Sequence, residues 1–371
     1  MDAKGNPNCR TVLMTADTVG GVWTYAMDLS RALGGYGTNV VLATMGQRMS
    51  SVQRAQAAGI RNLRVFESEY ELEWMPEPWA DVQRAGDWLR GIAEQVHPDV
   101  IHLNGYVHAA LPWNAPVIVM AHSCVLSWWH AVKGGNAPAE YDRYRREVAK
   151  GLRAADIVVA PTRGMLACIE RHYGRPTDAR VIPNGRDAAR YRVGRKEPFV
   201  LAAGRLWDEA KNISALQSIA RALPWPVCVA GDDVHPGGVR RPFADMCCLG
   251  VLSEDDLASW FARAAIYALP ARYEPFGLSV LEAALSGCAL VLGDIPTLRE
   301  SWSAAALFVD PNDGKMLLAA IKALIHNEPL RTTLAARARE RALKMDAVRM
   351  ARDWADTYAD AAALKEMKTC A

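Results

Sequence analysis

Two carboxylates flank an apolar stretch in the segment RYEPFGLSVLEAALSG, residues 272–287. Glu274 precedes Pro-Phe-Gly, and Glu282 follows eight positions later. Eight helical residues span roughly 12 Å, whereas the paired carboxyl groups of a glycosidase lie roughly 5–10 Å apart. The spacing therefore argues against an acid–base pair acting on one bond. Because a carboxylate can accept hydrogen bonds from two hydroxyls, we expect each acid to hold a separate diol.

The residues between the two acids predict an anion site. A helix is expected to begin near Phe276 or Gly277, and the first N–H groups of a helix have no partner within it. These groups carry the positive end of the helix dipole, and a glycine lets a ligand approach the backbone closely. A diphosphate could bind there, with a ribose held by one acid and a sugar by the other.

Two cationic residues are expected at the same edge of a sheet. Gly204-Arg205-Leu206 directly follows a predicted strand, and Lys211 opens the next predicted helix. Both side chains therefore project from the carboxyl end of that strand, where ligands bind in open α/β sheets. Two fixed cations suit a diphosphate. The alternative is that they are solvated loop charges.

The segments that position these residues alternate between short β-rich runs and amphipathic stretches. This order predicts parallel sheets that are covered by helices on both faces. Strands are expected at residues 11–16, 39–44, 99–103, 116–121, 156–161, 198–204, 226–231, 246–250, 266–270, 288–293 and 305–309.

The pattern breaks near Ile182-Pro183-Asn184-Gly185 and restarts at Pro198. A chain of 371 residues is long enough for two domains. We therefore predict an α/β chain of two doubly wound domains that face each other across a cleft. The first is expected at residues 1–190 and the second at 198–345, with a final helix at 346–371 that packs back on the first domain.

The composition is that of a soluble globular protein, with 51% hydrophobic and 23% charged residues. A net charge of +2 does not favour a nucleic-acid partner. Eight cysteines, none in a C-x-x-C pair and most in apolar runs, together with a polar N-terminus, predict a cytoplasmic protein. Residues 140–197 hold fourteen Lys or Arg against eight Asp or Glu, which we interpret as a solvated surface rather than a peripheral membrane contact.

Taken together, these motifs resemble the retaining glycosyltransferases of family 4, which have the GT-B fold of two Rossmann-like domains. Glu274-Pro-Phe-Gly-Leu-x-x-x-Glu282 resembles their E-x7-E signature, and Gly204-Arg205-Leu206 with Lys211-Asn212 resembles their phosphate motif. Similar motifs occur in the same order at Gly20-Gly21-Val22, Ile182-Pro183-Asn184-Gly185, Leu249-Gly250 and Val309-Asp310-Pro311. The likeness covers nearly the whole chain.

The resemblance implies roles for the matched residues of the second domain. Glu282 would hold the ribose, and Glu274 would contact the donor sugar. Arg205 and Lys211 would neutralise the diphosphate and stabilise the leaving group. No metal ion is implied, and no cofactor besides the nucleotide-sugar donor. Further contacts to the diphosphate or the base are implied for Gly277, Leu278, Ser279, Val251 and Leu252.

Signals in the first domain are weaker. His122 directly follows the strand at 116–121, where the family often has a histidine that contacts the donor sugar, and Ser123 is its neighbour. Gly20 and Gly21 open the first loop, which predicts close approach of a phosphate or acceptor rather than an ordinary turn.

Other residues near the same strand ends are secondary candidates. Trp128 and Trp129 are expected in a loop, where they either face a sugar or an apolar acceptor or pack locally. The weakest candidates for the acceptor side are His102, Asn104 and His108.

The predicted function is metal-independent transfer of a sugar from a nucleotide-diphosphate sugar to an acceptor hydroxyl, with retention of configuration. A UDP-sugar is favoured over a GDP-sugar, and the acceptor is a sugar, a lipid-linked molecule or another small molecule. Two alternatives are a related hydrolase or epimerase of nucleotide sugars and a non-catalytic nucleotide-sugar-binding protein. A nicotinamide dehydrogenase is disfavoured, because G-x-G-x-x-G is absent after the first strand.

Overall fold

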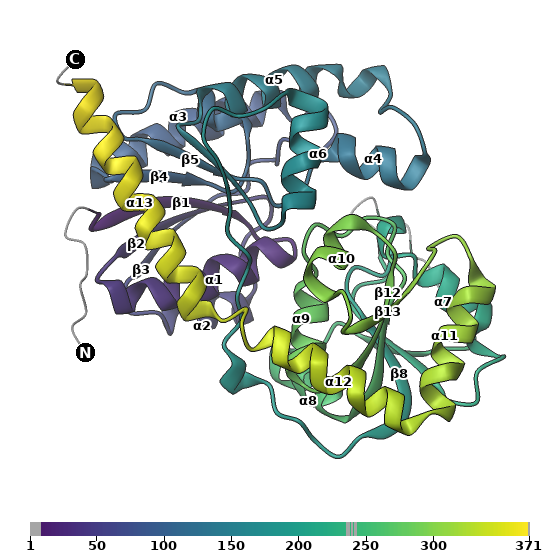
Figure 1. Cartoon of the computed structure of the whole chain (residues 1–371). Coiled ribbons are helices and arrows are strands. Elements are labelled where there is room, and N and C mark those ends of the chain that lie inside the picture. The colour runs from purple at the N-terminus through teal and green to yellow at the C-terminus, as the bar shows by residue number, and fades with distance from the viewer. Residues whose placement is uncertain (1–8, 235–237, 239, 241–242, 370–371) are drawn as a thin grey trace. The chain divides into compact units, whose positions relative to one another are not determined.

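The computed structural model describes residues 9–234, 238, 240 and 243–369 (Figure 1). The N-terminal residues 1–8 and Cys370, which contributed to the sequence analysis, lie outside the described residues. The chain divides into two compact units. Unit 1 comprises Met1–Ser127, Asn136–Gly185 and Ala347–Ala371, and unit 2 comprises Trp128–Gly135 and Arg186–Asp346. The grouping of Trp128–Gly135 with unit 2 was not anticipated from the sequence.

Unit 1 contains a seven-stranded parallel sheet in the order β3-β2-β1-β4-β5-β6-β7. Its strands are β1 (Thr11–Asp17), β2 (Asn39–Met45), β3 (Leu63–Glu67), β4 (Val100–Leu103), β5 (Val117–Met120), β6 (Ile157–Ala160) and β7 (Ala179–Val181). Its longer helices are α1 (Gly21–Leu33), α2 (Ser51–Ala58), α3 (Trp79–Val96), α5 (Asp142–Ala154), α6 (Arg163–Tyr173) and α13 (Ala347–Thr369), and α4 (Val125–Lys133) spans the boundary with unit 2.

Two strands of unit 1, β3 and β7, were not predicted. Both lie at the edges of the sheet, and their residues are mostly half-buried. An edge strand lacks the continuous apolar run that marks a strand buried on both faces. The central strands, such as β1 and β2, have that run and were predicted.

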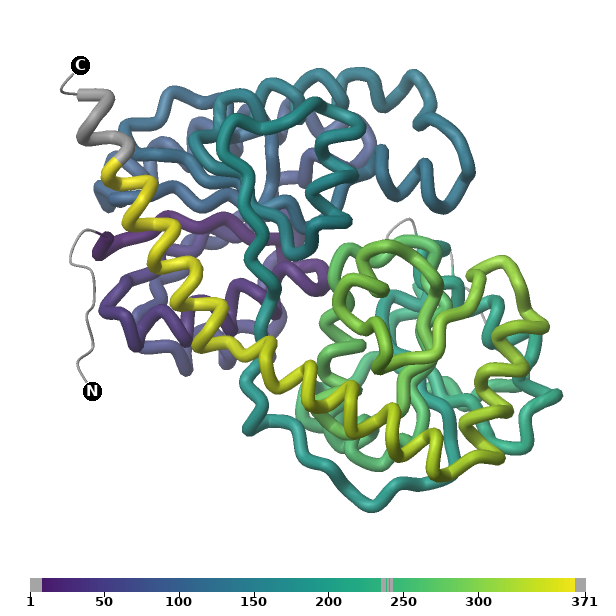
Figure 2. The backbone as a smooth tube through the Cα atoms, viewed as in Figure 1, coloured from purple at the N-terminus to yellow at the C-terminus, as the bar shows by residue number. Residues whose placement is uncertain are grey.

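One face of the unit 1 sheet is covered by α1, α2 and α13. Alternate residues of the strands, including Val12 and Met14 of β1, share a core with Leu29 of α1 and Trp354 of α13. Figure 2 shows α13, in yellow, running along this unit. The final helix therefore packs back on the first sheet, as predicted, and places its aromatic side chains beneath the central strands.

Unit 2 contains a six-stranded parallel sheet in the order β10-β9-β8-β11-β12-β13. Its strands are β8 (Glu197–Ala203), β9 (Val227–Ala230), β10 (Cys247–Gly250), β11 (Ala264–Leu269), β12 (Ala289–Gly293) and β13 (Ala306–Val309). Its longer helices are α7 (Ile213–Ala220), α8 (Glu254–Arg263), α9 (Leu278–Leu285), α10 (Pro296–Trp302), α11 (Gly314–His326) and α12 (Glu328–Ala342).

Successive residues of the unit 2 strands point into two different cores, because side chains alternate across a sheet. Leu201 and Tyr267 face one core with α8, α9 and α10. Val200 and Ile266 face the other with α7 and α11. The prediction of two Rossmann-like parallel sheets is confirmed.

Cys124, Cys228 and Cys288 are buried, whereas Cys247 and Cys248 are exposed in the edge strand β10. None of the helices in the described part of the chain combines the length and the apolarity needed to cross a bilayer.

Candidate functional site

The topology of unit 2 brings together the residues that carry the predicted chemistry. Strand β8 pairs with β9 on one side and with β11 on the other, so the strand order reverses beside β8. Ligands of open α/β sheets bind at the carboxyl ends of the strands at such a point. Arg205 and Lys211 follow β8 and Glu274 follows β11, so all three lie at this edge.

Lys211 and Glu274 form an ion pair across the loops that follow β8 and β11. Their side chains are only 15% and 10% exposed. The backbone of Glu274 is also held, because the hydroxyl of Thr297 in α10 donates to its carbonyl oxygen at 2.6 Å. The pair therefore presents a cation and a carboxylate at fixed positions.

Arg205 is held by Asp208, three residues further along the same loop. A terminal nitrogen of Arg205 lies 3.0 Å from Oδ2 of Asp208, and the guanidinium stacks on Trp207. Asp208 is buried, and burial alone would raise the pKa of its carboxyl, but the charges of Arg205 and Lys211 lower that pKa on balance. Arg205 remains 43% exposed, so it can reach a ligand.

Glu282 is buried and paired with Arg186, a partner that the sequence analysis did not identify. Nε of Arg186 lies 3.0 Å from Oε1 of Glu282 and 2.9 Å from the hydroxyl oxygen of Tyr191. The Arg186 side chain is 3% exposed. Its position directly after the Ile182-Pro183-Asn184-Gly185 motif is the only signal that could have identified it.

The helix start between the two acids has the expected geometry. Gly277 caps α9 with φ of 90°, a left-handed conformation that favours glycine. A Cβ at Gly277 would lie 3.0 Å from Val280 Cγ2. The first N–H groups of α9, at Leu278 and Ser279, therefore follow directly on a tight turn. The hydroxyl of Tyr267 donates to that of Ser279 at 2.7 Å, and the backbone N–H of Ser279, at the start of α9, suits an anion.

The residues predicted to meet the base lie beyond β10. Val251 is 78% exposed, and Leu252 packs partly against a unit 2 core. Nearby, a Cβ at Gly231 would lie 1.8 Å from the carbonyl oxygen of Gly204, so only glycine fits there. Gly231 thus lets the loops after β8 and β9 approach closely, a requirement that the sequence analysis did not recognise.

Asn212 connects three loops at this edge of the sheet. Its side-chain amide donates to the carbonyl oxygens of Pro270 at 2.9 Å and Pro311 at 2.7 Å. Its backbone is left-handed, with φ of 55°. Asn212 therefore fixes the loop that carries Lys211, which explains the asparagine that follows the lysine.

The predicted residues of unit 1 lie at the carboxyl ends of its own strands. Gly20 caps α1 with φ of 107°, and the space where its Cβ would be is open to 4 Å. Gly20 and Gly21 are both exposed. Gly20 is thus required by backbone conformation, and both glycines leave the backbone accessible.

His122 belongs to a polar network that extends into the core of unit 1. Its Nε2 lies 2.8 Å from Oδ1 of Asn104, and Nε2 of His102 lies 3.2 Å from the same oxygen. Nδ1 of His102 lies 2.7 Å from the hydroxyl of Tyr358. Burial lowers the pKa of both histidines to about 3, so both rings are neutral at physiological pH.

The secondary candidates have separate environments. His108 is buried, and its Nε2 lies 2.9 Å from the carbonyl oxygen of Val82, which indicates a structural role. Ser123 is exposed. The expectation of a loop at Trp128 and Trp129 is wrong, because both lie in α4. Within unit 2, the indole N–H of Trp128 donates to Asp208 at 3.0 Å.

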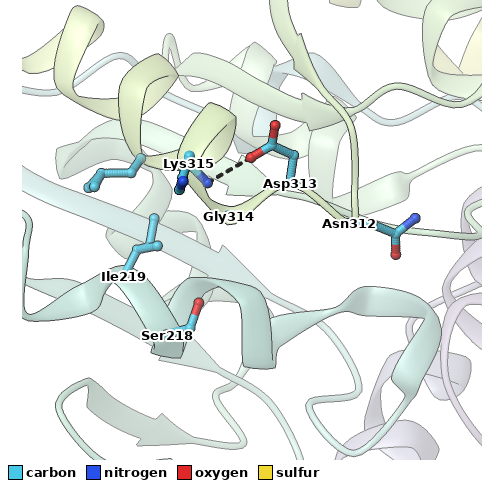
Figure 3. Close-up of a pocket in the computed structure, with 7 residues that line it drawn as sticks. Ser218, Ile219, Asn312, Asp313, Gly314 and Lys315 are labelled. Carbon is cyan, nitrogen blue, oxygen red and sulfur yellow. Dashed lines mark hydrogen bonds between the residues drawn. The ribbon is translucent and has the colours of Figure 1, made fainter.

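Two pockets are lined by described residues of unit 2. One of about 740 Å³ lies between α7 and the start of α11 (Figure 3). Its helix start is already capped by the carboxylate of Asp313, which accepts from the N–H groups of Lys315 and Met316. A second pocket of about 380 Å³ is lined by Asp208 and Asn212 and therefore adjoins the loop that follows β8. The described residues contain no cluster of side chains suited to a metal ion.

Sequence comparisons match the same two parts of the chain. A family model described as Glycosyltransferase Family 4 matches residues 19–190, and one described as Glycosyl transferases group 1 matches residues 186–341. A D-inositol 3-phosphate glycosyltransferase of Xylanimonas cellulosilytica is 27% identical over 387 residues, covering 92% of each chain.

Solved structures with the same fold are more distant in sequence. Sucrose-phosphate synthase from Thermosynechococcus elongatus has a TM-score of 0.79 at 18% identity and covers 94% of this chain and 98% of that chain. Anabaena Alr3699/HepE in complex with UDP-glucose has a TM-score of 0.75 at 16% identity, with 94% and 99% covered. These likenesses establish the GT-B fold.

Proposed function

Because this chain belongs to glycosyltransferase family 4 and is a glycosyltransferase, we propose that its donor is a UDP-sugar and that it transfers the sugar with retention of configuration. We propose further that the transfer needs no metal ion. The acceptor is a hydroxyl of a sugar, a lipid-linked molecule or another small molecule.

The observation that carries this proposal is the arrangement around the start of α9. Within unit 2, the Lys211–Glu274 pair and the Arg186–Glu282 pair are built on the two ends of one segment, with the Gly277 turn between them. A nucleotide sugar has the matching order of groups: a ribose diol, a diphosphate and a sugar diol. Glu282 would hold the ribose, the α9 N–H groups the diphosphate, and Glu274 the sugar.

The proposed reaction breaks the bond between the anomeric carbon and the phosphate oxygen. Negative charge then develops on the leaving diphosphate, and Lys211 and Arg205 stabilise it. The acceptor oxygen forms the new bond on the face from which the diphosphate departs, and its proton passes to a phosphate oxygen. The fixed cations do the work that a bound metal ion would otherwise do, which supports metal independence.

The test combines nucleotide binding with product analysis. Thermal-shift measurements with UDP, GDP and ADP should show the largest stabilisation with UDP, and a chelator should leave it unchanged. Incubation with UDP-sugars and candidate acceptors should give a new glycoside by mass spectrometry, with the anomeric configuration of the donor by NMR. Inversion, a requirement for a divalent cation, or a preference for GDP would each contradict the corresponding part of the proposal.

The same product analysis tests the alternatives. A nucleotide-sugar hydrolase would release free sugar, and an epimerase would return a different nucleotide sugar, in each case without an acceptor. Nucleotide binding without any product would favour a binding protein. Glu274 and Lys211 are held as a close pair of opposite charge, which favours a site built for turnover.

A further inference from the structure

The side chain of Asn104 joins two histidines in unit 1. Its Oδ1 is the partner of His122 Nε2 at 2.8 Å and of His102 Nε2 at 3.2 Å. An amide oxygen has two lone pairs and accepts only, so it can receive an N–H from each ring. Both rings therefore carry a proton on Nε2.

The orientation of the Asn104 amide is fixed by β1. Its Nδ2 donates to the carbonyl oxygen of Thr15 at 2.6 Å, and its backbone N–H donates to the Thr15 hydroxyl at 3.0 Å. The flipped amide would place Oδ1 against the Thr15 carbonyl oxygen, so two acceptors would face each other. The assignment of Oδ1 to the two rings is thus determined by its surroundings.

The C-terminal helix completes the network. With its proton on Nε2, His102 has a lone pair on Nδ1, which accepts the hydroxyl proton of Tyr358 at 2.7 Å. Trp354, one helical turn earlier in α13, stacks on the His102 ring with 4.2 Å between ring centroids. His102 is fully buried, so its orientation is set by these contacts.

These contacts determine what His122 can offer to a ligand. With its proton on Nε2, its Nδ1 carries a lone pair, and no residue in the described part of the chain is hydrogen-bonded to Nδ1. Tyr25 packs against the His122 ring edge to face, with centroids 4.5 Å apart, and restricts its rotation. His122 is partly exposed, so a ligand can reach it.

We propose that Asn104 is a positioning residue for His122: supported by His102 and Tyr358, it holds the His122 ring with its proton on Nε2, so that Nδ1 accepts a hydrogen bond from a sugar hydroxyl. The sugar contact rests on the proposed function. The proton arrangement rests on the contacts within unit 1. The C-terminal helix thereby contributes to the site through Tyr358, although Tyr358 does not touch the substrate.

The proton arrangement is tested directly by nitrogen NMR of ¹⁵N-histidine-labelled protein, because protonated and bare ring nitrogens have well-separated chemical shifts. The wild-type protein should show His102 and His122 with the proton on Nε2. Asn104→Leu should convert His122 to a mixture of the two tautomers. Tyr358→Phe, which keeps the size of the side chain, should change the Nδ1 signal of His102. Thr357→Val is the matched control, since Thr357 is buried in the same helix and its hydroxyl donates to the Asp353 carbonyl oxygen.

Kinetics test the consequence for transfer. Asn104→Leu should lower kcat/KM on the order of 3–10-fold, the range of a neutral hydrogen bond, while UDP binding stays unchanged. Tyr358→Phe should cause a smaller loss of kcat/KM. This variant still tests the positioning role if the Asn104→Leu variant fails to fold. Sugar transfer by a wild-type protein that carries the His122 proton on Nδ1, or an Asn104→Leu variant with unaltered tautomers, would overturn the positioning role alone. A wild-type protein with the expected tautomers but no transfer would overturn the proposed function, and with it the sugar contact.

Discussion

Nε of Arg186 lies 3.0 Å from Oε1 of Glu282, and both side chains are almost completely buried. Breaking a buried ion pair by removing one partner typically costs about 3–5 kcal/mol, because the remaining charge loses its compensation. We therefore expect Arg186→Met to lower the free energy of unfolding of unit 2 by that amount. Urea unfolding of the variant measures it.

The double variant Arg186→Met/Glu282→Met separates stability from function. Replacing both partners of a buried pair with apolar side chains is often neutral, so the double variant should regain most of the lost stability. It should still bind UDP on the order of 10–100-fold more weakly, because the ribose loses a charged acceptor. Isothermal titration with UDP checks this, and full affinity in the double variant would refute the ribose role of Glu282.

Lys211 is expected to act mainly on turnover. Its ammonium is fixed beside Glu274 at the end of β8, where charge develops on the leaving diphosphate. Removing one such stabilising group typically costs about 10²–10³-fold in kcat. Lys211→Ala should therefore lower kcat on that order, as measured by UDP release under saturating donor.

A matched lysine on unit 2 controls for a general loss of charge. Lys315 is exposed at the start of α11 and follows β13, whereas Lys211 follows β8. Lys315→Ala should leave kcat unchanged within about 2-fold, a difference below 0.5 kcal/mol. Equal losses of kcat in the Lys211→Ala and Lys315→Ala variants would show that Lys211 acts through overall charge rather than through its position.

Much of this site could be predicted because parallel strands end at a common edge. Strands β8 and β11 are buried apolar runs, so the sequence indicates where each strand ends. The residues that follow them were therefore expected at the same edge of the sheet. The Arg186–Glu282 pair could not be predicted in this way. It depends on residues 96 positions apart and on a backbone hydrogen bond from Arg186 to Met345, which sequence periodicity does not encode.

The unit 1 network was missed for a related reason. Asn104 bonds to groups on β1, β4 and the loop after β5, and His102 is completed by α13 at the far end of the sequence. His102 and Asn104 were recognised only as residues near a strand end. Their partners depend on which helix covers that face of the sheet, and an amphipathic helix pattern does not specify its packing site.

Gly277 should tolerate no side chain. Its φ of 90° is costly for an L-residue, by about 1–2 kcal/mol, and an added Cβ would lie 3.0 Å from Val280 Cγ2. Gly277→Ala should therefore destabilise unit 2 by at least about 1 kcal/mol and displace the first N–H groups of α9. Weaker UDP binding by titration is the expected functional result.

Gly314 provides the comparison for this substitution. It also begins a helix, α11, but it lacks a positive φ, and an added Cβ would be 3.9 Å from its nearest neighbours. Gly314→Ala should be neutral or stabilising by up to about 1 kcal/mol. If both alanine variants bound UDP equally well, the Gly277 turn would not be part of the diphosphate site.

Two histidines of unit 1, His102 and His122, predict a loss of stability in acid. Burial lowers the pKa of both His102 and His122 from 6.5 to about 3 in the folded chain. Between these values the unfolded chain binds protons that the folded chain does not, so the free energy of unfolding falls as pH falls below 6.5. Each histidine contributes a slope of at most about 1.4 kcal/mol per pH unit. Well above pH 6.5 both rings are neutral in either state, and their contribution is constant.

His122→Asn should remove one histidine's share of this slope. Urea unfolding of the variant and the wild type between about pH 5 and 8 measures the difference, because the other acid-sensitive groups cancel in the comparison. His97→Asn is the matched control, since His97 is exposed at the end of α3 and its left-handed backbone suits asparagine. The free energies of unfolding of His122→Asn and His97→Asn should therefore differ most at the acid end of this pH range. Parallel stability curves for the wild type and His122→Asn would mean that His122 has the same pKa in the folded and the unfolded chain, which would contradict this prediction.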